Sequence, residues 1–381
     1  MNQQQFKITY IIDGLTIGGA EKVVFDLASY MHEQGHDVEV VSLLRLPLEQ
    51  QPFAMELQQQ GISVISIEKK KKIDFSLQSR LVDYLHTRQP DIVHTHLWAS
   101  DTFGLRAVEQ VNSEYRSSSQ REIVALSTEH SINEHEGWLK HFLKRRSYAI
   151  ADRVIAISGT VQTYIEHVHR VPAQKTLTIS NGIDIERFAE AHVQKRNQKT
   201  LHIAVIGRLS HEKGQDLFID SLQYVTQDYH ARIVGSGHQL VEYERMVDLH
   251  NLSRKVSFVP AHIGIDTEYA LADIIVVPSR FEGLGLVVME AMAAGKAIIA
   301  NNIPAFQELL EHNVTGVLVN MEDASVVAAT IDELLRDSDK REALGKQAQS
   351  EAQTFSIASM YSSYEDVYEQ MLNKKSKAVV N

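Results

Sequence analysis

The hydrophobic positions of this chain form short runs rich in Val and Ile that alternate with longer stretches of helical period. Such alternation predicts strands separated by crossover helices, which is typical of a doubly wound parallel sheet. Helices are expected at 20–34 and 76–88, for example, where apolar residues recur every three to four positions. The strands expected in the first half are 7–13, 37–44, 63–67, 91–96, 123–130, 153–158 and 175–181.

The pattern stops in the polar stretch 190–200, which has no hydrophobic period and is predicted to be a linker, and then starts again. Later strands are expected at 202–209, 231–235, 256–260, 273–278, 296–300 and 316–319, followed by helix over most of 323–375. Two sets of βα units joined by one linker predict two α/β domains, residues 1–195 and 196–355. Ligands of such sheets bind at the carboxyl ends of strands, so the chemistry is expected in strand-to-helix turns.

Charge and composition narrow the class of protein. The 381 residues include 49 acidic and 38 basic side chains, a net charge of −11, and no cysteine. An acidic chain argues against a nucleic-acid binder, and the lack of cysteine excludes disulfides, thiolate metal sites and thiol nucleophiles. No apolar run reaches the length of a signal sequence or a membrane span, so we expect a cytoplasmic protein.

Two strand-to-helix turns carry features suited to phosphate. Gly18 and Gly19 precede a helix, where glycine allows close backbone approach and the helix N-terminus favours an anion. The spacing is not that of a dinucleotide fingerprint, and a plain tight turn explains this segment equally well. In the second half, Arg208 and Lys213 lie on a strand-end loop bounded by glycines, and a guanidinium fork with an ammonium suits a diphosphate. The alternative for that loop is two solvated charges.

The segment 278–295 is the most informative. It reads as a strand end, a glycine-rich turn containing Glu282, and a helix from about Leu286 that carries Glu290 on an otherwise apolar face. A carboxylate among apolar side chains is costly unless it is paired or binds hydroxyls, and vicinal sugar hydroxyls are good donors to it. The backbone N–H groups of Gly285 and Leu286 would face a phosphate. The alternative is a pair of ordinary surface glutamates.

Glu282 and Glu290 form a Glu-x7-Glu pattern, which occurs here with the Gly-Arg-Leu and Lys-Gly residues of 207–214 and with the Gly-Gly turn. In this combination the chain resembles the retaining glycosyltransferase family 4. The resemblance implies a GT-B fold: two Rossmann-like, doubly wound parallel-sheet domains that face a central cleft, with a last helix at about 356–381 packing back on the first domain.

The resemblance also assigns roles to residues. Arg208 and Lys213 would hold the donor diphosphate, Glu290 the nucleotide ribose and Glu282 the transferred hexose. His130, at a strand end of the first domain, matches the histidine beside the donor sugar. The expected catalytic residues are therefore His130, Glu282, Arg208 and Lys213, and the expected donor-binding residues are Gly18, Gly19, Arg208, Lys213, Glu282, Gly283, Leu284, Gly285, Leu286 and Glu290.

The implied activity is retaining transfer of a hexose from a nucleotide-diphosphate sugar, with UDP favoured, to a glycan or lipid-linked glycan acceptor. Bacterial surface polysaccharide or lipopolysaccharide synthesis is the expected setting, with no metal and no cofactor. The alternatives are a nucleotide-sugar epimerase or a phosphorylase on the same fold, or an inactive sugar-binding module. A Rossmann dehydrogenase is disfavoured because its fingerprint is absent.

Three further clusters remain. His94 and His96 alternate along a strand and share one face, but no third metal ligand is evident, so a structural or acceptor-side role is preferred. The run Lys69, Lys70, Lys71 and Lys72, and the cluster Lys140, Lys144, Arg145 and Arg146 beside Trp138 and Phe142, suit an anionic membrane surface. A solvated loop and an ordinary surface helix explain the same residues.

Overall fold

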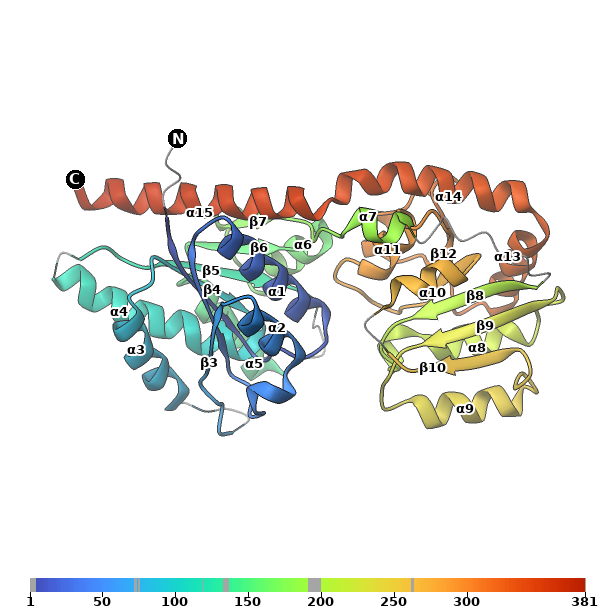
Figure 1. Cartoon of the computed structure of the whole chain (residues 1–381), viewed down its shortest axis with the longest axis horizontal. Coiled ribbons are helices and arrows are strands. Elements are labelled where there is room, and N and C mark those ends of the chain that lie inside the picture. The colour runs from blue at the N-terminus through green and yellow to red at the C-terminus, as the bar shows by residue number, and fades with distance from the viewer. Residues whose placement is uncertain are drawn as a thin grey trace. The chain divides into compact units, whose positions relative to one another are not determined.

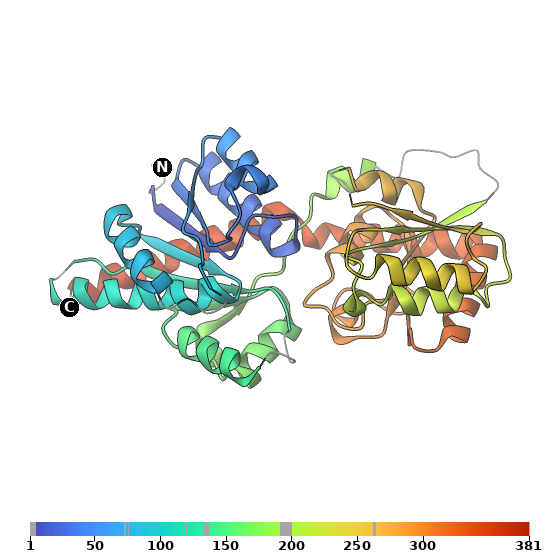
Figure 2. The same cartoon turned by 90° about the horizontal axis from the view of Figure 1, so that it is seen from below.

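A computed structural model describes residues 5–71, 74, 76–118, 120–132, 137–190, 200–261 and 264–380 (Figure 1). Its contacts group into two compact units, one of Met1–Ser180 with Met360–Asn381 and one of Asn181–Ser359. Each unit contains one parallel sheet with helices on both faces (Figures 1 and 2). The predicted architecture of two Rossmann-like domains is therefore confirmed.

The first unit has a seven-stranded sheet of order β3-β2-β1-β4-β5-β6-β7. Its strands begin at or next to the expected residues, because each is a local run of β-branched and apolar side chains. Their bounds are β1 Lys7–Ile12, β2 Asp37–Ser42, β3 Ser63–Ser66, β4 Ile92–His96, β5 Val124–Glu129, β6 Arg153–Ala156 and β7 Thr176–Thr178.

The helix α1, Gly19–Glu33, buries an apolar stripe that includes Val24, Leu27 and Met31. The helix α15, Ile357–Val380, runs from the second unit into the first, where Tyr364 and Tyr368 are fully buried. The other helical elements are η1 Leu48–Gln50, α2 Pro52–Gln59, α3 Ser76–Arg88, η2 Ser100–Gly104, α4 Leu105–Ser117, α5 Trp138–Tyr148, α6 Gly159–Val168 and η3 Ala173–Lys175.

The second unit has a six-stranded sheet of order β10-β9-β8-β11-β12-β13, again with the expected strands. The strands are β8 Leu201–Ile206, β9 Tyr229–Val234, β10 Val256–Val259, β11 Ile274–Val277, β12 Ala297–Asn301 and β13 Val317–Val319. The helical elements are α7 Ile185–Glu190, η5 His211–Lys213, α8 Gln215–Leu222, α9 Leu240–Leu249, α10 Asp266–Leu271, α11 Leu286–Ala293, α12 Pro304–Gln307, α13 Ala324–Arg336, α14 Ser338–Ala352 and η6 Gln353–Phe355.

The second unit begins at Asn181, earlier in the chain than the boundary at residue 195 that the sequence predicts. The backbone explains the difference, because Ile183 exchanges hydrogen bonds with Phe355 and Ile357. A Cβ atom on Gly182 would lie 2.4 Å from the Cα of Ile357, so only glycine permits this close pairing. Residues 191–199 of the predicted linker lie outside the described residues.

Each sheet has one point at which successive connections reverse direction. In the first unit it lies between β1 and β4, and in the second between β8 and β11. Crevices at the carboxyl ends of strands next to such a point are the usual binding sites of open α/β sheets. The fold therefore selects four loops: those that follow β1, β4, β8 and β11.

Candidate functional site

The loops after β8 and β11 lie side by side, because these two strands are neighbours in the sheet, with Ile274 in register with Ile203. The first loop carries Arg208 and the turn η5, which ends in Lys213 before α8 begins. The second loop, residues 278–285, carries Glu282 and leads into α11. The two motifs that the sequence singled out therefore share one edge of one sheet.

Glycine makes this proximity possible. Gly214 has φ +68°, and a Cβ atom there would lie 2.1 Å from the carbonyl oxygen of Pro278. Gly235, after β9, would place a Cβ atom 1.9 Å from the carbonyl oxygen of Gly207. Side chains at these positions would push the loops apart, so the glycines bring backbone against backbone.

Lys213 and Glu282 form an ion pair, with 2.5 Å between Nζ and Oε1. The hydroxyl of Ser279 donates to the same carboxylate oxygen at 2.9 Å. Both charged side chains remain partly exposed, so the pair is accessible to a ligand. The structure thus brings together two of the expected catalytic residues from separate loops.

Arg280, which the sequence analysis did not single out, fastens the two loops. Its guanidinium donates to both carboxylate oxygens of Asp216, at 2.9 and 2.6 Å, and to the carbonyl oxygen of His211 at 2.7 Å. Burial by itself would raise the pKa of Asp216, but the hydrogen bonds and charge of Arg280 outweigh it and lower that pKa. The position of this arginine two residues before Glu282 was the signal in the sequence that could have indicated its role.

Arg208 differs from Lys213 in its surroundings. Its side chain is 70% exposed, and its guanidinium lies 3.7 Å from Glu212 one turn later on the same loop. Its backbone is fixed, because its carbonyl oxygen accepts a hydrogen bond from Gln215 at 2.9 Å. Arg208 is therefore a cation on an anchored backbone with a side chain directed to solvent.

Glu290 lies in α11, where its carboxylate accepts a hydrogen bond of 2.5 Å from the hydroxyl of Tyr269. Tyr269 is fully buried, and burial together with the neighbouring Glu290 raises its pKa well above the usual range. The helix begins after Gly285, whose φ of +108° and whose contact with the ring of Phe306 leave no room for a side chain. Gly283, Leu284 and Gly285 are buried residues, and Leu286 starts the helix.

In the first unit, the loop after β1 leads to Gly18 and Gly19 at the start of α1. Gly18 is extended, and a Cβ atom there would meet the carboxylate of Glu21 at 2.3 Å. Asp13 accepts hydrogen bonds from the backbone N–H groups of Ala99 and Ser100, at 3.1 and 2.9 Å. The loops after β1 and β4 are thereby tied together at the reversal point of this sheet.

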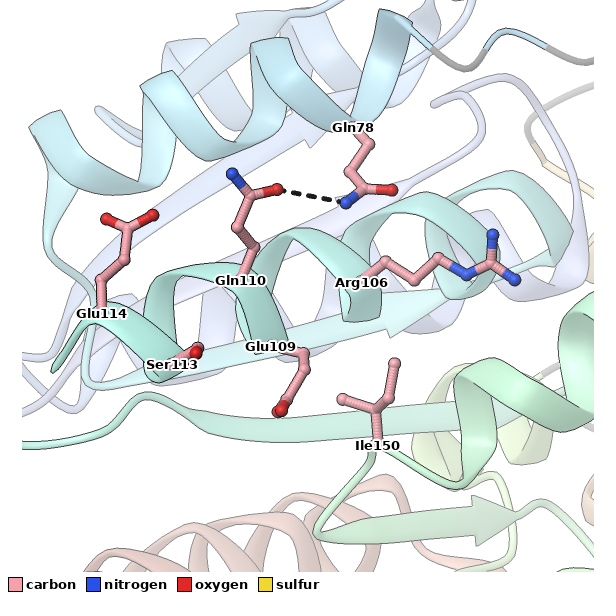
Figure 3. A pocket seen from close by; sticks show the side chains of 7 residues that line it. All are labelled: Gln78, Arg106, Glu109, Gln110, Ser113, Glu114 and Ile150. Carbon is pink, nitrogen blue, oxygen red and sulfur yellow. Dashed lines mark hydrogen bonds between the residues drawn. The ribbon is translucent and has the colours of Figure 1, made fainter. Parts of the chain in front are cut away.

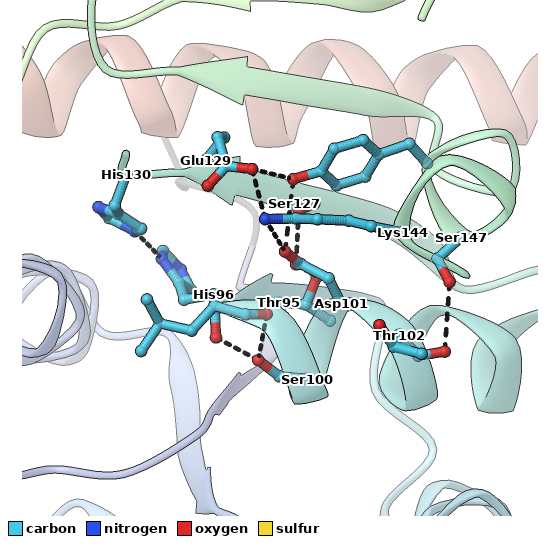
Figure 4. A network of polar contacts seen from close by, with 12 residues as sticks. Thr95, His96, Ser100, Asp101, Thr102, Ser127, Glu129, His130, Lys144 and Ser147 are labelled. Carbon is cyan, nitrogen blue, oxygen red and sulfur yellow. Dashed lines mark hydrogen bonds and ion pairs between the residues drawn. The ribbon is translucent and has the colours of Figure 1, made fainter. Parts of the chain in front are cut away.

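His130 follows β5 and lies beside the His-x-His pair of β4. Nε2 of His130 and Nδ1 of His96 are 2.9 Å apart (Figure 4). Both nitrogens of His94 are occupied, Nδ1 by the hydroxyl of Tyr368 and Nε2 by that of Thr128, each at 2.8 Å. Burial lowers the pKa of His94 to about 3 and that of His130 to about 4, so these imidazoles are neutral at pH 7.

A buried ionic network occupies the opposite face of β4 and β5 (Figure 4). Lys144 of α5 pairs with Glu129, and its Nζ lies 3.7 Å from Asp101. The hydroxyls of Thr95 and Ser127 donate to Asp101 at 2.7 and 2.6 Å. Burial raises the pKa of Asp101 to about 7.

This network corrects the sequence analysis, which grouped Lys144 with residues facing a membrane. The Lys144 side chain is 3% exposed, because it lies on the inner face of α5, where two carboxylates neutralise it. Arg145 and Arg146 are exposed on the same helix, as are Trp138 (79%) and Phe142 (48%). Lys140 lies over the ring of Trp98, with Nζ 5.4 Å from the ring centroid.

The lysine run after β3 is described only in part. Lys70 and Lys71 are exposed and Lys69 is partly buried, whereas Lys72 lies outside the described residues. Within the part of the chain that the structure covers, no helix is both long and apolar enough to cross a bilayer. The same residues contain no group of three or more side chains arranged to hold a metal ion.

A pocket between α3 and α4 contains none of the expected site residues (Figure 3). Gln78 and Gln110 form a hydrogen bond of 3.3 Å there, and Arg106 projects from the preceding turn of α4. Its lining comes from the two helices and from Ile150, and the strand-to-helix loops do not contribute. The candidate site is therefore built from the loops and not from this pocket.

Comparison with known proteins connects this geometry to a family. Residues 17–187 match the model described as Glycosyltransferase Family 4, and residues 186–351 match the one described as Glycosyl transferases group 1. The lipopolysaccharide core biosynthesis mannosyltransferase LpsB of Rhizobium meliloti is 32% identical over 213 residues, which span 51% of this chain and 57% of that protein. A glycogen synthase of Mycobacterium tuberculosis is 25% identical over 363 residues, 85% of this chain and 84% of the relative.

Solved structures share the fold. Anabaena HepE in complex with UDP superposes with a TM-score of 0.82 at 22% identity, over 96% of this chain and all of that one. A glycosyltransferase from Rickettsia africae gives a TM-score of 0.82 at 19% identity, over 97% and 99% of the two chains. At these identities the likeness concerns the fold.

Proposed function

The chain belongs to glycosyltransferase family 4, and on this premise we propose that it transfers a hexose from a nucleotide-diphosphate sugar to a glycan or lipid-linked glycan, with retention of anomeric configuration. The observation that carries the proposal is the ion pair of Lys213 and Glu282 at the reversal point between β8 and β11. That edge also holds the exposed guanidinium of Arg208 and the start of α11.

Each of these groups suits one part of a donor. Arg208 and Lys213 would bind the diphosphate, with N–H groups at the start of α11, near Gly285 and Leu286, directed at the same oxygens. Glu290 would accept hydrogen bonds from the ribose hydroxyls, held in place by Tyr269. Glu282 would accept from hydroxyls of the hexose, and His130 would contact the same sugar.

The proposed chemistry is electrostatic. The bond from the anomeric carbon to the β-phosphate oxygen breaks, and a bond to the acceptor oxygen forms on the same face of the sugar. The leaving phosphate takes the acceptor's proton. Negative charge grows on that phosphate, and preorganised donors such as Lys213 and Arg208 stabilise it without reorganising. We propose that these groups serve in place of a metal and that no cofactor takes part.

The relatives suggest the donor and the setting. HepE was crystallised with UDP and with UDP-glucose, and LpsB is named as a mannosyltransferase of the lipopolysaccharide core. We favour a UDP-sugar as donor and a surface polysaccharide or lipopolysaccharide as product, made at the cytoplasmic side of the membrane.

The test is an assay of purified protein with a panel of UDP- and GDP-sugars and a glycan or glycolipid acceptor. Acceptor-dependent release of the nucleoside diphosphate supports transfer. An epimerised nucleotide sugar would indicate an epimerase, dependence on inorganic phosphate a phosphorylase, and binding without turnover an inactive module. Any of those three outcomes would replace the proposal.

We also propose peripheral contact with an anionic membrane through α5. Its exposed residues Trp138, Phe142, Arg145 and Arg146 combine apolar and basic character, as interfacial helices do. Lys69, Lys70 and Lys71 would add charge. The test is cosedimentation with phosphatidylglycerol vesicles, comparing wild type with the double variant Trp138→Ser/Phe142→Ser. Equal binding by both, or binding that ignores the anionic lipid content, would refute this contact.

A further inference from the structure

The two faces of β4 and β5 carry different polar layers. On one face, Thr95, Ser127 and Glu129 meet Asp101 and Lys144 in the ionic network. On the other face, His94, His96, Thr128 and His130 form a layer of neutral groups. The functional proposal uses only His130 of this second layer. His96 is fully buried and contacts His130, so it can influence the residue that the functional proposal uses.

The hydrogen bond between the two imidazoles limits which ring nitrogens can carry a proton. Nδ1 of His96 and Nε2 of His130 lie 2.9 Å apart, so one of these nitrogens carries the shared proton. If His96 donates, His130 must hold its own proton on Nδ1. If His130 donates, its Nδ1 is a bare acceptor and His96 is protonated on Nε2. The two outer nitrogens therefore always consist of one donor and one acceptor.

Those outer nitrogens, Nε2 of His96 and Nδ1 of His130, are buried and have no hydrogen-bond partner among the described residues. A buried N–H without a partner is rarer in proteins than a buried acceptor without one. His96 is completely buried, whereas His130 is partly exposed at the end of β5. An N–H without a partner costs less on the residue that is nearer to solvent, so the bare acceptor belongs on His96 and the N–H on the buried Nδ1 of His130.

Two tyrosines of the helix α15 form hydrogen bonds with residues of this layer. The hydroxyl of Tyr368 lies 2.8 Å from Nδ1 of His94 and 3.0 Å from the hydroxyl of Tyr10. Tyr364 reaches the hydroxyl of Thr128 at 3.2 Å. The His94 ring then packs against that of His96, with 4.2 Å between the ring centroids. The ring of His94, which packs on His96, is thus fixed by hydrogen bonds at both of its nitrogens.

We propose that His96 is a positioning residue that holds His130 as the neutral Nδ1–H tautomer, whose N–H lacks a partner among the described residues and would donate to a hydroxyl of the transferred sugar once the donor is bound. The part that concerns the sugar rests on the proposed function, whereas the tautomer does not. His96 itself has no contact with substrate in this scheme. Its effect passes through Nε2 of His130.

Two amide variants distinguish hydrogen bonding from packing. In His96→Asn the amide nitrogen replaces Nδ1 and keeps a donor to His130, while in His96→Gln the amide lies where Nε2 was and the donor is lost. We expect kcat of His96→Asn within about threefold of wild type and that of His96→Gln roughly tenfold lower, the effect of one neutral hydrogen bond. Similar losses in both variants would show that His96 only fills space.

Nitrogen NMR tests the tautomer without any acceptor or turnover. In ¹⁵N-histidine-labelled wild-type protein at pH 7, with the His130 signals assigned by their loss in His130→Asn, we expect a protonated Nδ1 and a bare Nε2. The opposite pattern, or a rapid average of both tautomers, would overturn the proposal even if the protein is a transferase. The expected pattern in a protein that lacks transfer activity would leave the His96 assignment standing and reject only the sugar contact.

Discussion

The ammonium of Lys213 lies 2.5 Å from Oε1 of Glu282, although the two residues are 69 positions apart in the chain. The pairing follows from the sheet, because β8 and β11 are neighbours and their loops touch at Gly214 and Pro278. Without a donor each charge is neutralised by the other. A bound diphosphate would compete for Lys213 and free the carboxylate of Glu282 for sugar hydroxyls.

Removal of either partner should therefore reduce turnover. We expect Lys213→Ala to lower kcat by ~10²–10³, as the loss of a preorganised donor to a developing oxyanion does. Glu282→Gln should also reduce kcat, and the double variant should lose less than the product of the two single losses, because the residues interact. Steady-state kinetics with the best donor measures this, with the exposed Lys346→Ala as control. Near-wild-type turnover of Glu282→Gln would remove that residue from the proposed site.

The close contact of the two loops should be sensitive to a single methyl group. We expect Gly214→Ala to weaken donor binding and to destabilise the protein by more than the ~1–2 kcal/mol that a positive φ costs a residue with a side chain, because Cβ would also clash with Pro278. Gly35→Ala is the matched control, since Gly35 has φ +88° but open space around its Cβ position. Urea unfolding and donor KM measure both effects. Equal destabilisation by the two variants would contradict the contact.

The ionic network should make Lys144 far more important than its neighbour in sequence. We expect Lys144→Met to destabilise the protein by about 3–5 kcal/mol, because it leaves Glu129 and Asp101 as buried carboxyls without a cation. Arg145→Ala, an exposed site on the same helix, should stay within about 0.5 kcal/mol of wild type. Unfolding followed by tryptophan fluorescence reports on this unit, because Trp98 and Trp138 are the two tryptophans of the chain and both belong to it. A small effect of Lys144→Met would show that the pair is not needed for stability.

Acid should begin to destabilise the first unit at about pH 6.5, where histidines of the unfolded chain start to bind protons. Burial lowers the pKa of His94 to about 3, and that of His130 and His169 to about 4. Between pH 6.5 and 4 the unfolded chain binds protons that the folded chain does not. Each such histidine then lowers stability by up to about 1.4 kcal/mol per pH unit on acidification. Asp101 has the opposite effect, because its pKa is raised to about 7 and the folded chain binds this one proton at a higher pH than the unfolded chain does.

His169→Phe isolates one of these contributions, because it keeps an aromatic ring against Tyr148 and Tyr164 and removes the titrating nitrogens. We expect a smaller loss of unfolding free energy between pH 7 and pH 5 in this variant than in wild type. The exposed His167→Asn should change nothing. An unchanged pH dependence in His169→Phe would mean that His169 takes up its proton at the same pH in the folded and in the unfolded protein.

The strands and the motifs could be predicted from the sequence because both are local. Each strand is a contiguous apolar run, and the segments with Arg208 and Lys213 and with Glu282 and Glu290 each follow one. The order of the motifs in the chain, together with the rule that ligands bind at the carboxyl ends of strands, was enough to place them at one edge.

The tertiary structure decided what depends on partners distant in the chain. Lys144 reads as one of several basic residues on a helix, and only packing against Glu129 and Asp101 turns it inward. The sequence places His94 and His96 on one face of a strand. Their partners come from elsewhere in the fold: His130 from the end of the neighbouring strand β5 and Tyr368 from α15. The alternation of residues along a strand or helix determines which face of the element a side chain occupies. Which residues pack against that face depends on segments distant in the chain, and no local pattern contains that information.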